Sequence, residues 1–269
     1  MLRFSGVGRT NVGLVRADNE DSAFVGPTLM LVADGVGGNA GGEIASATSA
    51  YVVSASALSR VGLPPAGVLA AAVTQSQRQV AAGIRHSPAL TGMATTLTAL
   101  LTDGQHFALA HLGDSRGYVF RDDTLTRITS DHTWVQQMQD DGRMTEAEAS
   151  IHPWRNVVMR TVNGDPAYVA DIVPLALRPG DRVLLASDGL TDLVSDGWIE
   201  QILGSHADDA AVDMLVDAAL SAGGRDNITC VLATVVEGPA VSADGQLLGA
   251  VRDPSNIIDA AAVRAHASA

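Results

Sequence analysis

Aspartates that directly follow apolar, β-type runs are the feature of this sequence that most restricts its fold. Three runs carry them: LMLVADG contains Asp34, ALAHLGD contains Asp114 and VLLASDG contains Asp188. Each run has the apolar residues and the length of a buried strand. A carboxylate at the exit of such a strand is held on a rigid scaffold beside a crevice. We therefore expect a fold that brings several strand ends together.

The order of the expected elements favours two packed sheets with helices outside them. The first β-type runs are FSGVG, SAFVG and TLMLVADG, and two alanine-rich helices are predicted at about residues 41–60 and 65–86. A meander of ATTLTALLT, HFALAHLG, GYVFRD and TLTRIT follows, and then AYVADIVPL, DRVLLASDG, two helical patterns and DNITCVLATVV. Strands and helices segregated in this way indicate an α+β fold with two antiparallel sheets.

Residues 131–163 interrupt the β pattern with a charged segment that is helical in short pieces. Within this segment, Thr145 and Glu148 have the spacing of a capping box at a helix start. After residue 237 the periodic pattern ends. We therefore expect one domain over residues 1–237 and a loosely held tail over residues 238–269.

The charge balance and the cysteine content exclude several classes of function. With 30 Asp and Glu against 17 Lys and Arg, the net charge of −13 gives no reason to expect nucleic acid or an anionic membrane as partner. The chain has no run of about 18 apolar residues and no apolar leader, so we expect a cytoplasmic protein without a membrane span. The single cysteine, Cys230, lies in an apolar run and is expected to be a small buried side chain.

Aspartates that converge at strand ends need compensating charge. Two carboxylates at ~4 Å repel by about 4 kcal/mol at an effective dielectric near 20. Three such pairs would approach the whole stability of a domain, roughly 5–15 kcal/mol. Bound cations are the expected answer, and oxygen ligands select Mg²⁺ or Mn²⁺ over zinc. The glycine after Asp34 lets the backbone approach, so the Gly35 carbonyl is a further candidate ligand.

Six short segments follow one another along the chain: RADNEDS, LVADGVGGNAGGEIAS, GMATTLTAL, HLGDSRGYVFRD, LLASDGLTD and RDNIT. In order and spacing they resemble the motifs of the metal-dependent, type 2C family of serine/threonine protein phosphatases. The resemblance covers residues 4 to about 236 and is greatest for the bacterial branch, which reverses Ser/Thr kinases. It implies an αββα sandwich with the metal centre between the sheets at one end.

The resemblance also implies a set of metal ligands. Asp34 would bridge two ions, Mn²⁺ or Mg²⁺, with the Gly35 carbonyl on one of them. Asp188 and Asp226 would complete this pair of metals. Asp114, with Asp188, would match the third-metal position of bacterial members.

Two more residues and one segment take roles from the same resemblance. Asp21 would lie behind the metals or hold metal-bound water, and Arg16 would hold the substrate phosphate with both guanidinium nitrogens. Residues 131–163 would form a mobile flap beside the active site. Catalysis would then depend on Arg16, Asp34 and Asp188, with a hydroxide between the metals attacking phosphoserine or phosphothreonine.

The proton donor for the leaving group departs from the pattern of animal members. Those carry histidine after the first Asp-Gly, whereas this chain has Val36, and Asn39 stands where many bacterial relatives place histidine. Water on the third metal is the first candidate for the acid. His132 and His152, both in the expected flap, are the protein candidates, although each has a structural role as its simpler explanation.

Two other functions compete with an active phosphatase. A catalytically weak family member could act as a regulatory module that binds phosphoproteins, and loss of Asp34, Asp188 or Asp226 would have favoured that reading. The segment Asp34–Gly38 could also be a nucleotide-binding glycine loop, but it lacks the lysine of a P-loop. We therefore expect a monomeric phosphatase that acts on phosphorylated proteins and opposes Ser/Thr kinases.

Overall fold

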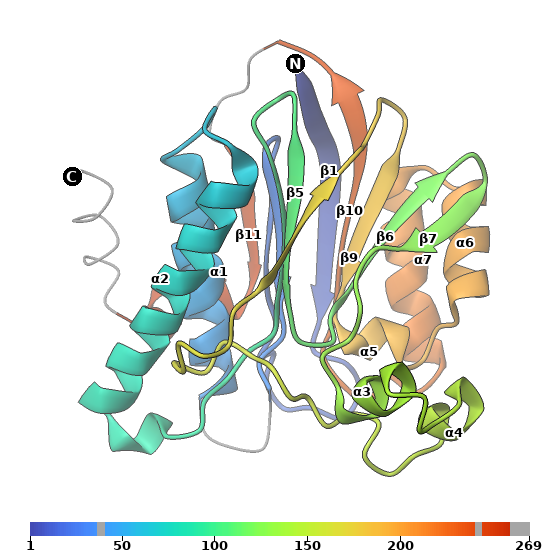
Figure 1. Cartoon of the computed structure of the whole chain (residues 1–269). Coiled ribbons are helices and arrows are strands. Elements are labelled where there is room, and N and C mark those ends of the chain that lie inside the picture. Colours follow the sequence, from blue (N-terminus) through green and yellow to red (C-terminus); the bar gives the residue numbers. More distant parts are fainter. Residues whose placement is uncertain (37–40, 240–243, 259–269) are drawn as a thin grey trace.

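The computed structural model describes residues 1–36, 41–239 and 244–258, and it is a sandwich of two antiparallel β-sheets between helices (Figure 1). The first sheet has the order β1-β10-β9-β6-β7, with bounds Leu2–Asn11, Ile228–Glu237, Arg182–Ala186, Arg116–Arg121 and Thr124–Arg127. The second has the order β11-β2-β3-β4-β5-β8, with bounds Gln246–Gly249, Ser22–Val25, Leu29–Ala33, Leu97–Thr102, Phe107–Leu112 and Asp171–Leu175. The expected α+β sandwich is confirmed.

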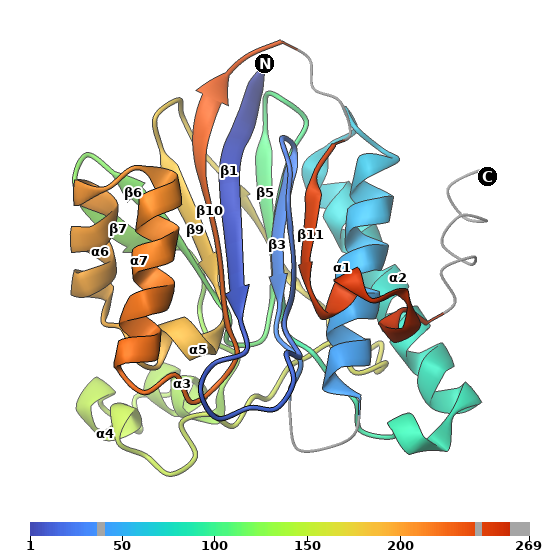
Figure 2. The same ribbon diagram turned by 180° about the vertical axis from the view of Figure 1, so that it is seen from behind.

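Helices cover both outer faces of the sandwich (Figures 1 and 2). The helices on the second sheet are α1 (Gly42–Leu58) and α2 (Pro65–His86), and those on the first are α6 (Asp196–Ser205) and α7 (Asp208–Ser221). Three shorter helices, α3 (Trp134–Asp140), α4 (Glu146–Ser150) and α5 (Asp188–Thr191), lie at one end, and the 3₁₀ turns are η1 (Pro88–Leu90), η2 (Ala250–Arg252) and η3 (Pro254–Asn256). The two alanine-rich helices begin and end within a few residues of their predicted positions.

Three apolar layers hold these elements together. Met30, Leu109 and Leu185 lie in the layer between the sheets. A second layer joins α1 and α2 to the second sheet, and a third joins α6 and α7 to the first. Strands such as β3, β4 and β5 are buried along their whole length, because each of their faces meets an apolar layer. This double burial explains why they read as continuous apolar runs instead of alternating ones. Cys230 is fully buried in the third layer, as predicted.

The segment predicted to be a helical excursion contains α3 and α4. Thr145 and Glu148 form the expected capping box at the start of α4: the Thr145 hydroxyl accepts from the Glu148 amide, and the Glu148 carboxylate accepts from the Thr145 amide. Both helices lie at the end of the sandwich where β1, β3 and β9 finish (Figure 1).

The prediction of a loosely held tail is wrong for residues 244–258. β11 pairs with β2 at the edge of the second sheet, beside α1 (Figure 2). Leu248 enters the layer between the sheets and Val251 enters the layer under α1, so this segment completes two cores. The sequence signal failed because β11 is only four residues long and follows GPAVSADG, a stretch without a periodic apolar pattern. Residues 259–269 lie outside the described part of the chain.

No helix in residues 1–36, 41–239 and 244–258 is both long and apolar enough to cross a membrane.

We predict that Leu248→Ala lowers the free energy of unfolding by about 2–4 kcal/mol, because it empties space in the layer between the sheets. Urea unfolding followed by circular dichroism measures the change. Leu63→Ala is the matched control, since Leu63 is 53% exposed and its loss should change stability by less than about 0.5 kcal/mol. Equal stability of the Leu248→Ala variant and the wild type would show that β11 does not belong to the fold in solution.

Candidate active site

Carboxylates line a cavity of about 210 Å³ at one end of the sandwich. Four predicted ligands surround it, namely Asp34, Asp114, Asp188 and Asp226. The other lining residues are Arg16, Gly35, Val36, Thr96, Asn156 and Val158. The structure therefore brings together every residue assigned to the site from sequence except Asp21, which lies behind the cavity wall. Asn39 is outside the described residues.

The directions of the strands explain why these residues meet. β3 and β5 run the same way in the second sheet, so Asp34 and Asp114 leave it at the same edge. In the first sheet β9 ends where its antiparallel neighbour β10 begins, so Asp188 and Asp226 flank one another. β1 also ends beside the start of β10, which brings Arg16 to the same edge. Residues up to about 210 positions apart in sequence thus become neighbours.

Backbone contacts fix the first aspartate. The Asp34 amide donates to the Thr96 hydroxyl at 3.0 Å, and the Thr96 amide donates back to the Asp34 carbonyl at 2.8 Å. The next residue, Gly35, is packed so tightly that a Cβ there would lie 2.7 Å from the Gly42 carbonyl. Only glycine fits at this position, as the sequence predicted from the close backbone approach.

Asp21 carries the clearest sign of a missing partner. Its side chain is fully buried, and its Oδ2 accepts from the Ser187 hydroxyl at 2.9 Å, next to Asp188 in the chain. Its Oδ1 is buried without a hydrogen-bond partner in the described part of the protein. A buried carboxylate oxygen left unpaired is costly, so a bound water or cation is the expected partner.

Arg16 forms an ion pair that the sequence did not predict. Its Nη2 donates to Asp226 Oδ2 at 2.8 Å, and about two-fifths of each side chain is exposed. The expectation that Arg16 holds the substrate phosphate stays a prediction, and in the structure Arg16 contacts Asp226 instead. Asn227 holds the loop that carries Arg16, because its amide nitrogen donates to the carbonyls of Val12 and Asp18.

The carboxylates raise one another's pKa values. Burial is the largest cause, and it lifts the pKa of Asp34 and of Asp188 well above the ordinary value, with repulsion from Asp21 and Asp114 respectively as the next cause. Burial raises the pKa of Asp21 to about 6 and that of Asp114 to about 7. The cluster therefore resists full ionisation at neutral pH unless positive charge enters it.

Divalent cations fit this set of donors. The residues facing the cavity offer carboxylate and carbonyl oxygens, which are the ligands of Mg²⁺ and Mn²⁺, and Arg16 is the one cation among the residues that line it. No three carboxylate, imidazole or thiol groups in the described segments converge as tightly as a ready-made metal cage does. The carboxylates are spread around the cavity, and a cation would have to draw them inward.

The flap is pinned to the body beside this cavity. Asp131, at its start, accepts from both Arg116 and Arg127, so Arg116 has a structural role. Asn156 extends from the flap into the cavity wall, and its side-chain amide donates to Asp192, the residue directly after α5, at 2.7 Å.

Neither histidine considered as the proton donor lines the cavity. The His132 side chain is 8% exposed and is held by the Gly113 amide, Asp171 and Arg160. The His152 ring stacks on Trp134, with 5.0 Å between the ring centroids. Both side chains therefore have the structural roles that were the simpler explanation.

Sequence reasoning missed four residues of the site. Thr96 and Ser187 hydrogen-bond to Asp34 and Asp21, and Asn156 reaches Asp192 from the flap. Thr96, Ser187 and Asp192 lie inside the six motifs quoted from the sequence. Ser187 and Asp192 are close to Asp188 in the chain, and Thr96 has only its place in the motif as a signal. Asn156 lies in an irregular segment without any such signal.

The fold and the cavity define the class of protein as a sandwich of two antiparallel sheets between helices, with a candidate site for divalent cations at one end. Residues 6–232 match the sequence profile of the protein phosphatase 2C family. The chain belongs to this family.

Two relatives show how far the likeness extends. The chain is 43% identical over 240 residues to the serine/threonine protein phosphatase PstP of Mycobacterium tuberculosis, covering 88% of this chain and 46% of PstP. It therefore spans about half the length of that relative. It is 31% identical over 234 residues to the serine/threonine phosphatase stp of Listeria welshimeri, covering 83% of this chain and 93% of that protein.

Solved structures agree with the fold. The crystal structure of M. tuberculosis PstP superposes with a TM-score of 0.82 at 41% identity, covering 87% of this chain and all of that one. The catalytic domain of PstP in complex with two manganese ions gives the same TM-score at 40% identity and covers 88% of this chain. The nucleotide-binding reading of the glycine segment has no support in these comparisons.

Metal-free protein should lose stability as the pH rises through neutrality. Asp114 binds its proton more tightly in the folded state than in the unfolded chain, whose aspartates titrate near 4. The contribution of Asp114 to the free energy of unfolding is therefore largest at low pH. It decreases as the pH rises and is lost above the folded-state pKa of about 7. We expect a loss of about 1 kcal/mol between about pH 6.5 and pH 8 in EDTA, measured by urea unfolding.

The Asp114→Asn variant is the control, because it removes this titration while keeping the shape of the side chain. Its stability should change less over the same pH range, and Mn²⁺ should stabilise the wild type most at the higher pH. If the Asp114→Asn variant lost more stability than the wild type over this pH range, Asp114 would not be the group that causes the loss.

Proposed function

We propose that the protein is a metal-dependent phosphatase that hydrolyses phosphoserine and phosphothreonine in proteins. The observation that carries the proposal is one cavity with four aspartates around it and an arginine at its rim. Family membership and the two manganese ions of the PstP catalytic domain support it. Asp34, Gly35, Asp188 and Asp226 are the proposed ligands of two Mn²⁺ or Mg²⁺ ions.

Further assignments belong to the same proposal. Asp114 with Asp188 would hold a third ion, and Asp21 would position water behind the metals through its unpaired oxygen. Residues 1–237 would be the catalytic domain, with the flap at about 131–163. The names of the relatives support phosphoproteins as substrates. A role opposite Ser/Thr kinases in the cytoplasm is part of the proposal.

The chain's own groups suggest how a phosphate ester is handled. When bound, the metal ions supply positive charge for the phosphoryl oxygens and lower the pKa of a coordinated water. Arg16 would leave its ion pair with Asp226 and bind two oxygens of the substrate phosphate. A guanidinium group binds phosphate with two parallel hydrogen bonds. Asn156 and Val158 close the cavity from the flap side and would exclude water from the ester.

We predict that the protein hydrolyses p-nitrophenyl phosphate and a phosphothreonine peptide with Mn²⁺, and that EDTA abolishes both activities. Asp188→Ala should lower kcat by about a hundredfold or more, because it removes charge that holds the metals. Asp209→Ala is the control, since that side chain is 83% exposed and far from the cavity in the fold. Metal-independent hydrolysis would overturn the proposal, and tight peptide binding without turnover would favour the regulatory module instead.

We predict a separate effect for the arginine. Arg16→Ala should lower kcat/KM by about 10- to 100-fold, which corresponds to the loss of a charged hydrogen bond of about 1.5–3 kcal/mol. Arg16→Lys should recover little of this loss, because an ammonium lacks the two-pronged geometry. Steady-state kinetics with the phosphopeptide measure both variants, and Arg143→Ala, on a 71% exposed side chain, is the control. If the Arg16→Ala variant kept full activity, Arg16 would have no role in binding phosphate and would serve only as the ion-pair partner of Asp226.

A further inference from the structure

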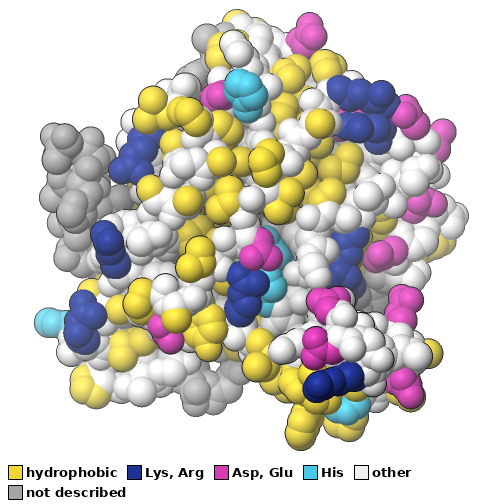
Figure 3. Space-filling model, in the orientation of Figure 1, with side chains coloured by type: hydrophobic (Ala, Val, Ile, Leu, Met, Phe, Trp, Pro, Cys, Tyr) yellow, Lys and Arg dark blue, Asp and Glu magenta, His cyan; other side chains and the backbone are white. Residues whose placement is uncertain are grey.

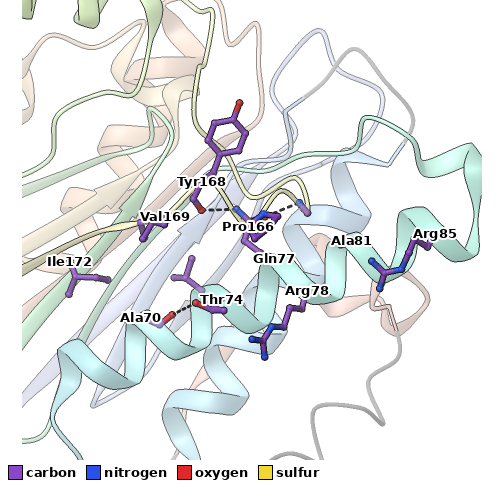
Figure 4. A pocket seen from close by; sticks show the side chains of 13 residues that line it. Ala70, Thr74, Gln77, Arg78, Ala81, Arg85, Pro166, Tyr168, Val169 and Ile172 are labelled. Carbon is purple, nitrogen blue, oxygen red and sulfur yellow. Dashed lines mark hydrogen bonds between the residues drawn. The ribbon is translucent and has the colours of Figure 1, made fainter.

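A buried glutamine joins α2 to the segment that leaves the flap (Figure 4). Gln77 is 4% exposed, and its amide nitrogen donates to the carbonyls of Thr161 and Tyr168, each at 3.1 Å. Its amide oxygen accepts from the amides of Asn163 and Gly164. Every polar atom of this side chain is therefore used, so the position of the segment relative to α2 is fixed.

Beside this glutamine, α2 and the fixed segment enclose a cavity of about 420 Å³ (Figure 4). One stripe of α2 lines it, at the three- and four-residue spacing of a helix face: Ala70, Val73, Thr74, Gln77, Arg78, Ala81 and Arg85. The opposite wall consists of Gly164, Pro166, Tyr168, Val169, Ala170 and Ile172. This cavity shares no lining residue with the carboxylate cavity.

Small side chains create the hollow, and its walls are mostly apolar. Ala70, Thr74 and Ala81 leave space on the helix side, while Val169 stays 68% exposed on the other side. A volume of this size lies in the usual range for sites that bind small molecules. The cavity therefore has room for an apolar group of a few carbon atoms up to a ring system.

Two arginines give the cavity its charge. Arg78 and Arg85 stand seven residues apart on the same face of α2, and neither forms an ion pair within the described residues. Figure 3 shows separate basic side chains along the side of the molecule where α2 lies, and further basic side chains elsewhere on this face. No acidic residue lines the cavity, although the chain as a whole carries 30 acidic and 17 basic residues. The local charge thus favours an anion, in contrast to the rest of the molecule.

We propose that this cavity is a second ligand site, which binds a small amphipathic carboxylate whose apolar part packs against Val73, Val169 and Ile172. Its charged end would pair with Arg78, because a guanidinium group suits a planar carboxylate, while Arg85, two turns further along α2, adds positive charge at the far end of the cavity. Because the ligand would contact both α2 and the segment after the flap, binding would stabilise the arrangement that Gln77 holds. The site does not depend on the phosphatase activity proposed above.

Anilinonaphthalene sulfonate, a fluorescent amphipathic anion, tests the proposal on the full chain. We expect octanoate to displace the dye, and acetate and octanol to fail, because acetate lacks the apolar part and octanol lacks the charge. The double variant Arg78→Gln/Arg85→Gln should bind octanoate about tenfold more weakly or worse, the loss expected for one charged hydrogen bond. Arg252→Gln, at an exposed arginine elsewhere, should bind as the wild type does.

Two further variants locate the site. Thr74→Leu should fill the hollow and reduce octanoate binding without loss of stability, since Thr74 is exposed at the cavity wall. Asp188→Ala should leave octanoate binding unchanged, which separates this result from any failure of phosphatase activity. The proposal is overturned if octanol or acetate competes as well as octanoate, if the double arginine variant binds octanoate normally, or if Asp188→Ala abolishes binding.

Discussion

Repulsion between carboxylates at one end of the sandwich is the constraint on which the rest of this structure depends. Burial is the largest cause that raises the pKa values of Asp34 and Asp188, and repulsion from Asp114 raises both further, while Asp21 lies buried behind the cavity with one oxygen unpaired. Such a cluster works against folding unless cations are bound. The rest of the sandwich must therefore contribute enough free energy of folding to offset the unfavourable carboxylate cluster.

The three apolar layers provide that stability, and they also fix the positions of the aspartates at the strand ends. Each strand that delivers an aspartate is anchored along its length in one or two layers, so its end has little freedom to move. Even the late segment contributes, because Gly249 packs against the Asp21 carbonyl and the Ala250 amide donates to it at 2.8 Å. A site built on rigid strand ends keeps its geometry better than one built on loops.

The flap is connected to the body at both ends by polar contacts. Asp131 holds its beginning through two arginines, and Gln77 holds the segment after its end. Between that segment and the site, Val162 pairs with Thr95, and the Thr95 hydroxyl donates to the Asp34 carbonyl. The second cavity is therefore joined to the carboxylate cavity by a short run of hydrogen bonds.

The sequence by itself determined the strand and helix order, the aspartates at strand exits and the glycine beside Asp34, because apolar periodicity and turn chemistry are local properties. The six motifs then identified the family and most of the site. Only the tertiary structure decided that Arg16 pairs with Asp226, that Asn156 reaches the cavity and that β11 completes the second sheet. It also brought Gln77 and the two arginines of α2 to a second cavity. These facts depend on contacts between residues far apart in the chain, and such contacts leave no periodic trace in the sequence.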